Sequence, residues 1–535
     1  MKDPVSRRLT SRRIREDVAQ SEFLEPDPLH PNNGDEARYA NRIGSSTKGL
    51  AHDPATGEVI PAAYDALLAA LRSGEFDDIE SLAANRHLGC SCSDVAHRRR
   101  FVNPQSAYAF DLEGIDSHQL VMPPAPAFAS AQEAGEMVEL YWMALLRDVS
   151  FSAYDADPVA AQAAEDLSNL SDFRGPRQGG RVTAATLFRD GYPGCTVGPY
   201  ISQFLLQPVG FGAQNIDTRI HSNAPGEDFV TTFSEWLGVI NGCQPPSSPA
   251  IGNGPHVYCD NGRTLSQYVH TDVLFQAYFV ACLNLLGGDY PGDPGNPYGR
   301  FIDHTGTGLP LPSGMSGSAA DIGFGTFGAP AIATLVCEPA TRALKHQWYQ
   351  KWLVHRRLRP EEFGGHVEVQ RMCRAKYPFH PDLFRSDVLA AIEARHGTHL
   401  LPQAFPEGSP LHTAYGSGHA TVAGACVTVL KWFFDESAEI RNPVVPDPSD
   451  PGRLIPYVAP PGEPPLTVGG ELNKLASNIS QGRDHAGVHW RTDATEANRL
   501  GEEVALSMLR ELRGLYSEPY AGLSLTRFDG STVTV

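Results

Sequence analysis

The sequence contains no long apolar run. Among its 535 residues there is no stretch of 18 apolar positions, so no transmembrane helix is predicted. The first 20 residues carry five arginines but no apolar h-region, and they do not form a standard secretory signal. We expect a soluble protein without a membrane partner, cytoplasmic by default, with export left open.

Positive charge is also scarce. The chain has 43 Lys and Arg residues against 62 Asp and Glu residues, which gives a formal net charge of -19. An acidic surface repels polyanions, and this argues against a nucleic acid as partner. A cluster of Lys and Arg inside this chain is therefore informative, because the overall charge works against it.

Cysteines in a metal-binding spacing are absent. The nine cysteines are an odd number, and their spacing matches no zinc pattern. Cys90 and Cys92 form the only close pair, and there a disulfide, at the surface or between subunits, is favoured over a metal site. Cys282, Cys337 and Cys426 are predicted to be buried free thiols.

Strand-like alternation is rare, apart from a short stretch at residues 531–535. Apolar residues at helical spacing instead mark seven segments: 61–75, 131–149, 269–286, 329–358, 420–434, 471–479 and 495–515. Pro339 is expected to break the fourth segment, and the fifth is apolar nearly all round, as in a buried bundle helix. The pattern predicts a mainly α fold with two stacked helical bundles and long loops.

The first 60 residues differ from the rest of the chain. They are polar and interrupted by Pro and Gly, which predicts an extended N-terminal arm of the kind that wraps a neighbouring subunit. Residues 61–535 are then expected to form a single domain. Segments rich in Gly and Pro at 172–265, 287–317 and 442–467 are expected to be loops.

The most informative stretch is the tetrapeptide Gly416-Ser417-Gly418-His419, directly before the apolar helix predicted at 420–434. Backbone N–H groups point out of a helix N-terminus, where the helix dipole favours an anion. The Ser417 hydroxyl adds a donor, and Gly418 allows close approach of the backbone. Alone, however, the motif is more often a capped helix with a surface histidine.

Lys351 and Arg359 form the second informative piece. Eight residues along an ideal helix correspond to a rotation of roughly 80° and a rise of about 12 Å. The two cations can therefore meet at one anion only if the helix bends or ends near Arg359. Pro360 favours such an end, since the residue before a proline is pushed out of the α region. The alternative is a solvated basic face that also includes Arg356 and Arg357.

Arg483 and His489 form the third piece. Arginine offers a fork of donors that suits oxyanions. His489 could act as a nucleophile or as a metal ligand through one ring nitrogen, and the other nitrogen would then need an acceptor. Asp493, four residues further on, is one candidate acceptor and a backbone carbonyl is another. His485 is interpreted as an exposed neighbour rather than as a second polar group of the site.

Together, the three pieces resemble those of a known family. The pattern K-x7-R-P, then S-G-H, then R-x5-H-x3-D is similar to that of the vanadium-dependent haloperoxidases, which share it with type-2 phosphatidic-acid phosphatases and bacterial class A acid phosphatases. Residues 139–149, 198–205 and 404–410 resemble segments of algal bromoperoxidases, so the resemblance spans roughly residues 100–515. The Lys351–Arg359 spacing resembles that of the algal bromide enzymes and is one residue longer than is typical of the phosphatases and fungal chloroperoxidases.

The resemblance, which is closest to the algal and cyanobacterial bromoperoxidases, implies a role for each residue. The vanadate would be held by Lys351, Arg359, Ser417, Gly418, Arg483 and His489. His489 would bind the vanadium itself through Nε2, and His419 would be the general acid–base residue of catalysis. The site would be built from residues 345–365, 405–425 and 480–495. Gly416 stands where many relatives have a proline, which changes the stiffness of the turn but removes no ligand.

Two further positions follow from the same resemblance. His412 lies five residues before Ser417, where the algal bromide enzymes have a second histidine, and it is expected to take part in catalysis or halide selection. Trp348 lies three residues before Lys351, at a position that the resemblance links to halide selectivity. A plain core aromatic on a helix explains Trp348 equally well.

The implied activity is the oxidation of bromide, and of iodide, by hydrogen peroxide to a hypobromous-acid-like species that halogenates small organic nucleophiles. The resemblance also implies a homo-oligomer, with the dodecamer of red-algal types as one size, and a structural calcium ion, for which residues 303–321 are only loosely patterned. One alternative is an acid phosphatase-like phosphohydrolase that uses the same oxyanion pocket, with His489 as the nucleophile. Another is a helical assembly protein with a vestigial anion pocket.

Overall fold

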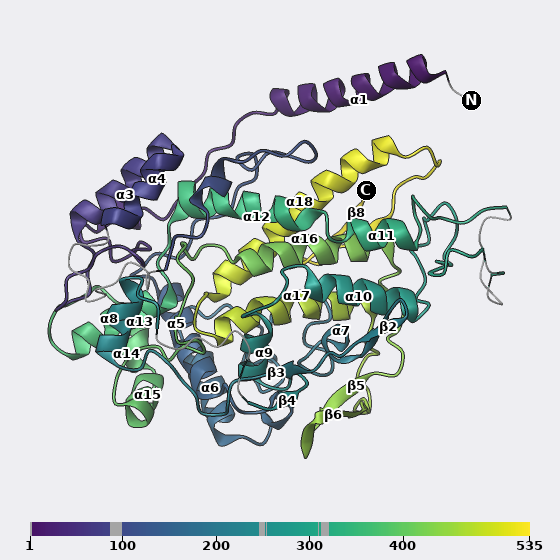
Figure 1. Cartoon of the computed structure of the whole chain (residues 1–535). Helices are drawn as coiled ribbons and strands as arrows, with labels where there is room; N and C mark the ends of the chain where they lie inside the picture. The colour runs from purple at the N-terminus through teal and green to yellow at the C-terminus, as the bar shows by residue number, and fades with distance from the viewer. Residues whose placement is uncertain (1–2, 86–98, 246–251, 253, 309, 312–319) are drawn as a thin grey trace.

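The structure is a computed structural model that describes all residues except 1–2, 86–98, 246–251, 253, 309 and 312–319. Helices form its framework, and the strands of the described residues occur only as short antiparallel pairs (Figure 1). The mainly α class predicted from the sequence is therefore confirmed.

One group of helices surrounds α16 (Gly418–Phe433), which is buried along nearly its whole length. It packs against α12 (Pro339–Tyr349), α17 (Val468–His485) and α18 (Arg491–Leu515). The contact with α18 is close: a Cβ atom on Gly424 would lie 2.0 Å from the carbonyl oxygen of Asn498, and one on Gly501 would lie 1.9 Å from that of Thr421. Glycine at these two positions lets the helices approach almost backbone to backbone.

A second group of helices packs around α5 (Ala131–Leu145), on the left of the molecule in Figure 1. Its other members are α6 (Pro158–Asn169), α8 (Phe233–Ile240), α13 (Pro360–Arg371), α14 (Asp382–Arg385) and α15 (Val388–His396). Helix α5 is buried from Glu133 to Ala144, so its acidic residues must find cationic partners inside the protein.

Shorter elements complete the fold. The remaining helices are α2 (Asp35–Arg38), α3 (Pro61–Ser73), α4 (Phe76–Asn85), η2 (Pro104–Tyr108), η3 (Phe151–Ala153), α7 (Gln203–Leu206), α9 (Gly262–Tyr268), α10 (Gln276–Gly287) and α11 (Ala329–Leu335). The strand pairs are β1 (Val209–Phe211) with β2 (Gln214–Ile216), β3 (Ile220–His221) with β4 (His256–Val257), β5 (Val444–Asp447) with β6 (Asp450–Pro456), and β7 (Ser524–Thr526) with β8 (Thr532–Thr534).

The expectation of an extended N-terminal arm was wrong for the first part of the chain. Residues 4–24 form helix α1 (Pro4–Leu24), which lies apart from the body of the molecule at the top of Figure 1. The Asp3 side chain caps this helix by accepting from Ser6 N at 3.3 Å, and Pro4 occupies its first turn. Both are helix-start signals that the proline and glycine content of the segment obscured. Residues 43–52, also assigned to the arm, are mostly buried in the body.

Two predicted helical segments are interrupted where the site needs loops or turns. In the segment 269–286, only the residues from Gln276 onward are helical, as part of α10. The preceding helix, α9, has already ended at Tyr268. The segment 329–358 breaks before Pro339, as predicted, and continues past α12 as a π-helical turn, η4 (Gln350–His355). The first break leaves residues 269–272 free to face the site.

Cys282 and Cys426 are buried free thiols, as predicted, whereas the free thiol of Cys337 is only half-buried. The pair Cys90 and Cys92 lies outside the described residues. Among the helices of the described chain, none combines the length and the apolar character needed to cross a membrane.

Candidate active site

Three segments that are distant in the sequence meet at the N-terminus of α16. Lys351 lies in the π-helical turn η4, which ends at Arg356 in the left-handed conformation with φ of 36°. The chain then turns, and Arg359 is the N-cap of the next helix, α13, directly before Pro360. The helix thus ends between Lys351 and Arg359, as the proline predicted, and both side chains reach the same buried region.

The Lys351 side chain is fully buried. Its Nζ donates to the carbonyl oxygens of Thr413 at 2.7 Å and Ala414 at 2.8 Å, in the loop that leads to Ser417. Burial lowers the pKa of Lys351 well below its ordinary value, and the nearby Arg359 lowers it further. The carbonyl groups fix the ammonium in place but bring no negative charge to balance it.

Arg359 is the centre of the contacts in the site. Its Nε donates to His412 O at 2.9 Å, and its Nη1 donates to Val488 O at 2.7 Å and lies 2.9 Å from His489 Nε2. Its backbone N donates to Glu362 Oε2 at 2.7 Å. The guanidinium is buried, and this burial lowers its pKa to about 9.

His489 is oriented by Asp493, as its spacing predicted. His489 Nδ1 lies 2.8 Å from Asp493 Oδ2, and a carboxylate can only accept, so Nδ1 carries the proton. Nε2 is therefore left with its lone pair and faces Arg359. Burial, followed by the charges of Arg359 and Lys351, lowers the pKa of His489 well below its usual range, which keeps the ring neutral. A neutral imidazole with an oriented lone pair is the form that binds a metal.

Arg357 holds the other oxygen of Asp493. Its Nη1 donates to Asp493 Oδ1 at 2.8 Å, and its Nη2 pairs with Glu133 and Glu136 of α5. The guanidinium lies 4.5 Å from the centre of the Trp490 ring. The interpretation of Arg357 as part of a solvated face was therefore wrong, because its side chain is buried and paired with buried carboxylates. Glu133 and Glu136 lie more than 200 residues away in the sequence.

Ser417 and Gly418 begin helix α16. Ser417 is the N-cap: its Oγ accepts from Ala420 N at 3.4 Å, and its own N donates to Asp493 O at 2.8 Å. A Cβ on Gly418 would lie 3.1 Å from the Trp348 ring, so a larger residue would crowd this wall of the site. The N-terminus of α16 therefore lies next to the segments that carry Lys351 and His412. The N–H groups of a helix N-terminus suit an anion.

His419 is paired with Asp272, a residue that the sequence reasoning missed. His419 Nε2 lies 3.0 Å from Asp272 Oδ1, and the histidine side chain is 20% exposed. Burial would raise the pKa of Asp272, but His419 and Arg483 outweigh it and hold this pKa below its ordinary value. Asp272 follows the end of α9 without any recognisable motif, so no local signal marked it.

Arg483, from α17, is the third buried cation. Its Nη1 donates to Val269 O at 2.7 Å, and its Nε has no hydrogen-bond partner within the described residues. Burial lowers its pKa, although Asp272 and Glu407 act in the opposite direction. A buried guanidinium nitrogen without a partner indicates room for an acceptor that is not part of the protein.

The interpretation of His485 as an exposed neighbour of the site was wrong. The ring is fully buried among Phe151, Phe188 and Tyr200, and burial lowers its pKa to about 3. It faces away from Arg483 because the two residues are two positions apart on α17, and residues at i and i+2 of a helix do not share a face.

His412 and Trp348 lie side by side next to Arg359. Their ring centres are 4.9 Å apart, and Arg359 Nη2 lies 2.9 Å from His412 Nδ1. His412 Nδ1 also lies 3.1 Å from Thr413 O. This nitrogen accepts from Arg359 when it is unprotonated and donates to the carbonyl group when it is protonated. Burial, together with Arg359 and Lys351, lowers the pKa of His412 well below its usual value and favours the neutral ring.

The N-terminal segment supports the turn that carries Arg359. Glu362 Oε1 accepts from Thr47 N at 2.7 Å, Thr47 Oγ1 at 2.8 Å and Lys48 N at 3.0 Å. Lys48 also forms a buried ion pair with Glu361, and its Nζ donates to Glu407 O at 3.1 Å. Residues 47–48 therefore connect the start of α13 with the loop that leads to His412.

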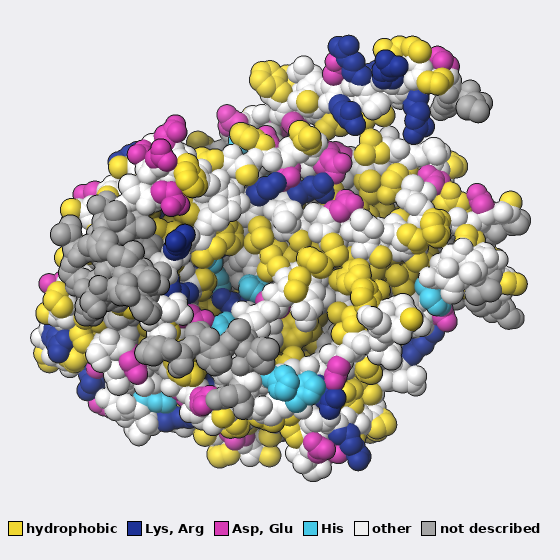
Figure 2. Space-filling view, in the orientation of Figure 1, with side chains coloured by type: hydrophobic (Ala, Val, Ile, Leu, Met, Phe, Trp, Pro, Cys, Tyr) yellow, Lys and Arg dark blue, Asp and Glu magenta, His cyan; other side chains and the backbone are white. Residues whose placement is uncertain are grey.

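The site as a whole has an excess of buried positive charge. The charges of Arg359 and Arg483 help to lower the pKa of Lys351, and the charge of Arg483 helps to lower the pKa of Arg359. Each cation disfavours the charged form of its neighbours. Figure 2 shows a hollow on this face of the molecule with Lys or Arg and His side chains at its floor. A multiply charged oxyanion would balance these charges, so the residues present fit the vanadate that the sequence resemblance implied.

No cluster of three or more His, Cys, Asp or Glu side chains that could hold a metal ion is found among the described residues. Residues 303–321 were considered for calcium, and part of this segment lies outside the described residues. Within it, Asp303 Oδ1 accepts from Thr305 N at 2.8 Å and Gly306 N at 3.1 Å. The calcium ion stays an expectation from the sequence.

Comparison with known proteins identifies relatives that cover nearly all of the chain. It is 34% identical to the vanadium-dependent bromoperoxidases of Corallina pilulifera, over 94% of this chain and 94% of the relative, and of Corallina officinalis, over 96% and 93%. It is 30% identical to the vanadium-dependent bromoperoxidase of Ascophyllum nodosum over 95% of both chains.

Structural comparison agrees with the sequence relatives. The homohexameric structure of the second vanadate-dependent bromoperoxidase from Ascophyllum nodosum superimposes with a TM-score of 0.89 and 28% identity, covering 99% of this chain and 91% of that chain. A family model described as the VCPO second helical-bundle domain matches residues 391–518, which include α16 and α17.

Proposed function

The chain belongs to the vanadium-dependent bromoperoxidases, and we propose that it holds vanadate among Lys351, Arg359, Arg483 and His489. It oxidises bromide with hydrogen peroxide to a hypobromous-acid-like species, which halogenates small organic nucleophiles. Iodide, the more easily oxidised halide, is a substrate as well.

The observation that carries the assignment of the site is the set of three buried cations, none of which forms an ion pair with a described residue. Lys351 Nζ is held by two neutral carbonyl groups, and Arg483 Nε has no partner among the described residues. Buried charge without an ion-pair partner is costly, and Lys351, Arg359 and Arg483 would offset that cost by donating to the oxygens of a vanadate anion. Ser417 and the N–H of Gly418 add donors from the helix N-terminus.

His489 would supply the protein ligand to vanadium. Its Nδ1–H is fixed on Asp493, so Nε2, which accepts from Arg359 Nη1 in this structure, is the nitrogen whose lone pair would coordinate vanadium. When bound, the vanadate group supplies Lewis-acid activation of hydrogen peroxide, which makes a peroxide oxygen electrophilic toward bromide. Lys351 and the two arginines neutralise charge on the oxygens and so favour this activation.

His419 is the general acid–base residue. Asp272 holds its Nε2–H, which leaves Nδ1 as the basic nitrogen. The side chain is partly exposed, whereas His412 and His489 are almost completely buried, so His419 is the histidine that incoming peroxide can reach. Nδ1 takes a proton from the peroxide and returns it to the departing hydroxide.

We place His412 and Trp348 at the halide side of the site. The contact of their rings, and the position of Lys351 Nζ 6.0 Å from the centre of the Trp348 ring, make one wall next to the cations. A neutral His412 there can donate a hydrogen bond to a halide, while Trp348 excludes water. This wall is the part of the site expected to influence the choice between bromide and chloride.

The phosphohydrolase alternative is less well supported. The Lys351–Arg359 spacing resembles that of the bromide enzymes, and the relatives that cover the whole chain are bromoperoxidases. Release of phosphate from a phosphomonoester without peroxide, at a rate above that of the His489→Ala variant, would favour the phosphohydrolase.

We also propose that the protein is a homo-oligomer. The Ascophyllum nodosum relative that superimposes over 99% of this chain is a homohexamer. The dodecamer, one size that the sequence resemblance implied, stays a prediction that a mass measurement in solution can decide.

The activity is tested by bromination of monochlorodimedone with protein that has been stripped by chelation. We expect no turnover with bromide and peroxide until orthovanadate is added, and full dependence on all three afterwards. His489→Ala, which removes only the ligand, is the control and should stay inactive at the same vanadate concentration. Turnover without vanadate, or none at any vanadate concentration, contradicts the assignment.

A further inference from the structure

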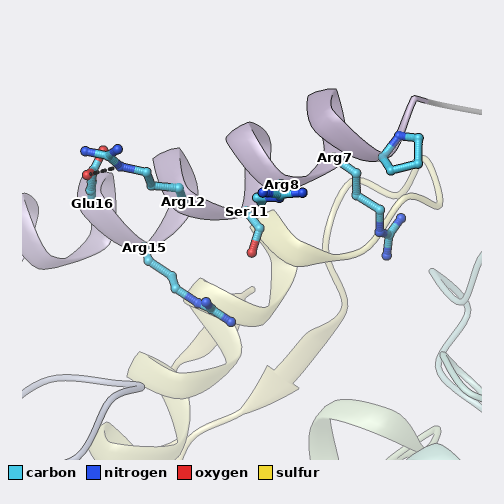
Figure 3. Close-up of a pocket in the computed structure, with 7 residues that line it drawn as sticks. Arg7, Arg8, Ser11, Arg12, Arg15 and Glu16 are labelled. Carbon is cyan, nitrogen blue, oxygen red and sulfur yellow. Dashed lines mark hydrogen bonds and ion pairs between the residues drawn. The ribbon is translucent and has the colours of Figure 1, made fainter.

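Helix α1 is a basic element that is mostly exposed. No residue of this helix is buried, and the side chains of Val5, Leu9 and Phe23 are 56%, 62% and 83% exposed. Arg7, Arg8, Arg12 and Arg15 are all exposed and border one open space beside this helix. Figure 3 shows Arg7, Ser11 and Arg15 extending from one side of the helix, with Arg12 beside Glu16.

The arginines of this side are largely without partners in their own subunit. Within the described residues Arg12 pairs with Glu16 at 2.6 Å, but no ion pair is formed by Arg7, Arg8 or Arg15. Helix α1 packs on its own subunit only in part: Ser11, Ile14, Val18 and Glu22 are half-buried, and Gln119 Nε2 donates to Glu22 O at 3.1 Å. Most protein helices depend on fuller packing of one face. A partner that covers α1 would provide this packing.

A complementary acidic surface lies on the α3–α4 hairpin. Within α3 and α4 and the turn between them, exposed carboxylates are carried by Asp65, Glu75, Asp77, Asp78 and Glu80. Phe76 lies between two of them and is 62% exposed. Apart from the contact of Asp65 with Arg42 at 3.8 Å, these carboxylates form no ion pair with any described residue.

We propose that α1 of one subunit docks on the α3–α4 hairpin of a second copy of the chain. The arginines Arg7, Arg8 and Arg15 would meet the carboxylates of Glu75, Asp77 and Asp78, with exposed apolar side chains of α1 against Phe76. This inference rests on the proposal that the chain is a homo-oligomer and adds which surfaces meet.

The placement of the two surfaces allows a reciprocal contact. Helix α1 and the α3–α4 hairpin both lie along the upper edge of the molecule in Figure 1, on the side seen in Figure 2. In a two-fold dimer the same patch serves both subunits, so each α1 can cover the hairpin of the other subunit. A two-fold dimer would contain two such contacts, and together they would bury twice the surface of a single α1–hairpin contact.

The charge of the chain decides between partners for α1. A free basic helix could also bind an anionic lipid surface. The chain as a whole, however, carries a net charge of -19, so a membrane or nucleic acid would repel the body while it attracted the helix. A second copy carries the same net charge, so what favours it is the local match between the arginines of α1 and the exposed carboxylates of the α3–α4 hairpin.

The test is charge reversal on each surface, measured as molar mass by light scattering of the vanadate-loaded full-length enzyme. Arg7→Glu/Arg8→Glu/Arg15→Glu should weaken association about tenfold or more, because attraction becomes repulsion at three positions. Glu75→Lys/Asp77→Lys/Asp78→Lys should weaken it similarly. Bromide peroxidation per subunit should stay unchanged in both variants, since all six changed side chains are exposed and none belongs to the proposed site.

Mixing the two variants is the decisive step. Each variant alone opposes like charges, but in the mixture the acidic α1 meets a basic hairpin and the basic α1 meets an acidic one. We expect equimolar mixing to restore the mass of the unchanged protein. A positively charged Arg13→Lys variant, altered on another side of α1, is the matched control and should assemble normally.

The outcomes separate the two proposals. If the unchanged protein is a monomer at micromolar concentration, the homo-oligomer proposal fails and this inference fails with it. If the protein is an oligomer that both reversed variants keep, only the docking of α1 is overturned. Binding of the unchanged protein to phosphatidylserine vesicles, lost in the arginine variant without a change of mass, would assign α1 to membranes and also overturn it.

Discussion

At the scale of single residues, the chemistry depends on a chain of contacts that ends at His489. Arg357 fixes one oxygen of Asp493, and the other oxygen fixes Nδ1 of His489. The ring can therefore neither rotate nor change its tautomer without breaking a buried hydrogen bond. This orientation is what makes Nε2 a ligand rather than one more buried nitrogen.

Replacing Asp493 by asparagine should weaken vanadate binding. The amide keeps the shape of the side chain but loses the charge that stabilises Nδ1–H, and such changes next to a metal ligand typically cost about 10- to 100-fold in affinity. The dissociation constant is measured by equilibrium dialysis with elemental analysis of vanadium.

The matched control for this change is Asp484→Asn on α17. Burial raises the pKa of Asp484 well above its ordinary value, and neither carboxyl oxygen has a hydrogen-bond partner within the described residues, so an uncharged amide suits this position. We expect vanadate affinity within about twofold of the unchanged protein, consistent with nearly neutral isosteric replacement. Equal weakening in both variants would mean that Asp493 has no special role.

The histidines His419 and His489 should differ in what their removal abolishes. His419→Ala should keep bound vanadate and lose about 10²- to 10⁴-fold in kcat, the usual contribution of a general acid–base residue. His489→Ala should lose the vanadium itself. Vanadium content and steady-state bromination are measured on the same samples, and an equal loss of vanadium in both variants contradicts the division of roles.

The sequence identified most residues of the candidate site but not their supports. Lys351, Arg359, Ser417, Arg483 and His489 were recognisable because their spacing matches a known motif. Asp272 and the role of Arg357 were not, because their partners lie far away in the sequence and no short pattern records such a pairing. One sequence signal for the role of Arg357 was available: the acidic residues of α5 recur every three residues on a helix that is buried.

At the scale of elements, helix ends and turns position the site. Lys351 and Arg359 converge because η4 ends between them and Pro360 starts α13 in a new direction. The apolar pattern predicted the long helices well, since burial of a face is visible in the sequence. It failed for residues 43–52, whose polar side chains are buried against partners from α13 that a local pattern does not reveal.

Lys48 tests the contribution of this N-terminal segment. Lys48 and Glu361 form an ion pair in which both side chains are 1% exposed. Lys48→Met should destabilise the protein by about 3–5 kcal/mol, because it leaves Glu361 buried without its cation. Denaturant unfolding of the vanadate-free protein measures the change.

The double variant Lys48→Met/Glu361→Gln should recover most of that stability, since neither side chain then carries a charge. Arg12→Ala, which removes the exposed pair with Glu16 on α1, is the control and should leave the unfolding midpoint unchanged. If Lys48→Met unfolds at the same denaturant concentration as the unchanged protein, the segment does not support α13.

At the scale of the whole molecule, buried histidines make stability sensitive to acid. The pKa is lowered by burial to about 4 for His52 and to about 3 for His355, His366 and His485. Below about pH 6.5 the unfolded chain takes up protons at these positions that the folded protein refuses until the pH approaches 3 or 4. The free energy of unfolding should therefore fall as the pH is lowered through this window.

Glu133 opposes this trend by one proton. Burial raises its pKa to about 8, so between pH 4.5 and pH 8 the folded state holds a proton that the unfolded state has lost. The histidines outnumber it, and acid destabilisation should prevail below pH 6.

The variant His366→Phe isolates one histidine. The ring lies 6.3 Å from Phe128 in an aromatic cluster, so phenylalanine fits the surroundings. The slope of the unfolding free energy between pH 4.5 and pH 6 should decrease by about 1.4 kcal/mol per pH unit, the value for one proton. Unfolding by urea at several pH values measures this slope, and an unchanged slope would mean that His366 titrates normally in the folded state.

The central claim is that one vanadate lies among the three buried cations and is tethered by His489. A crystal structure of the vanadate-loaded protein, with the vanadium located by its anomalous scattering, tests this most directly. The account predicts a single strong site per subunit at bonding distance from His489 Nε2, with Lys351, Arg359 and Arg483 directed at its oxygens. Vanadium bound elsewhere, or a site in which Nε2 of His489 is not a ligand, would contradict it.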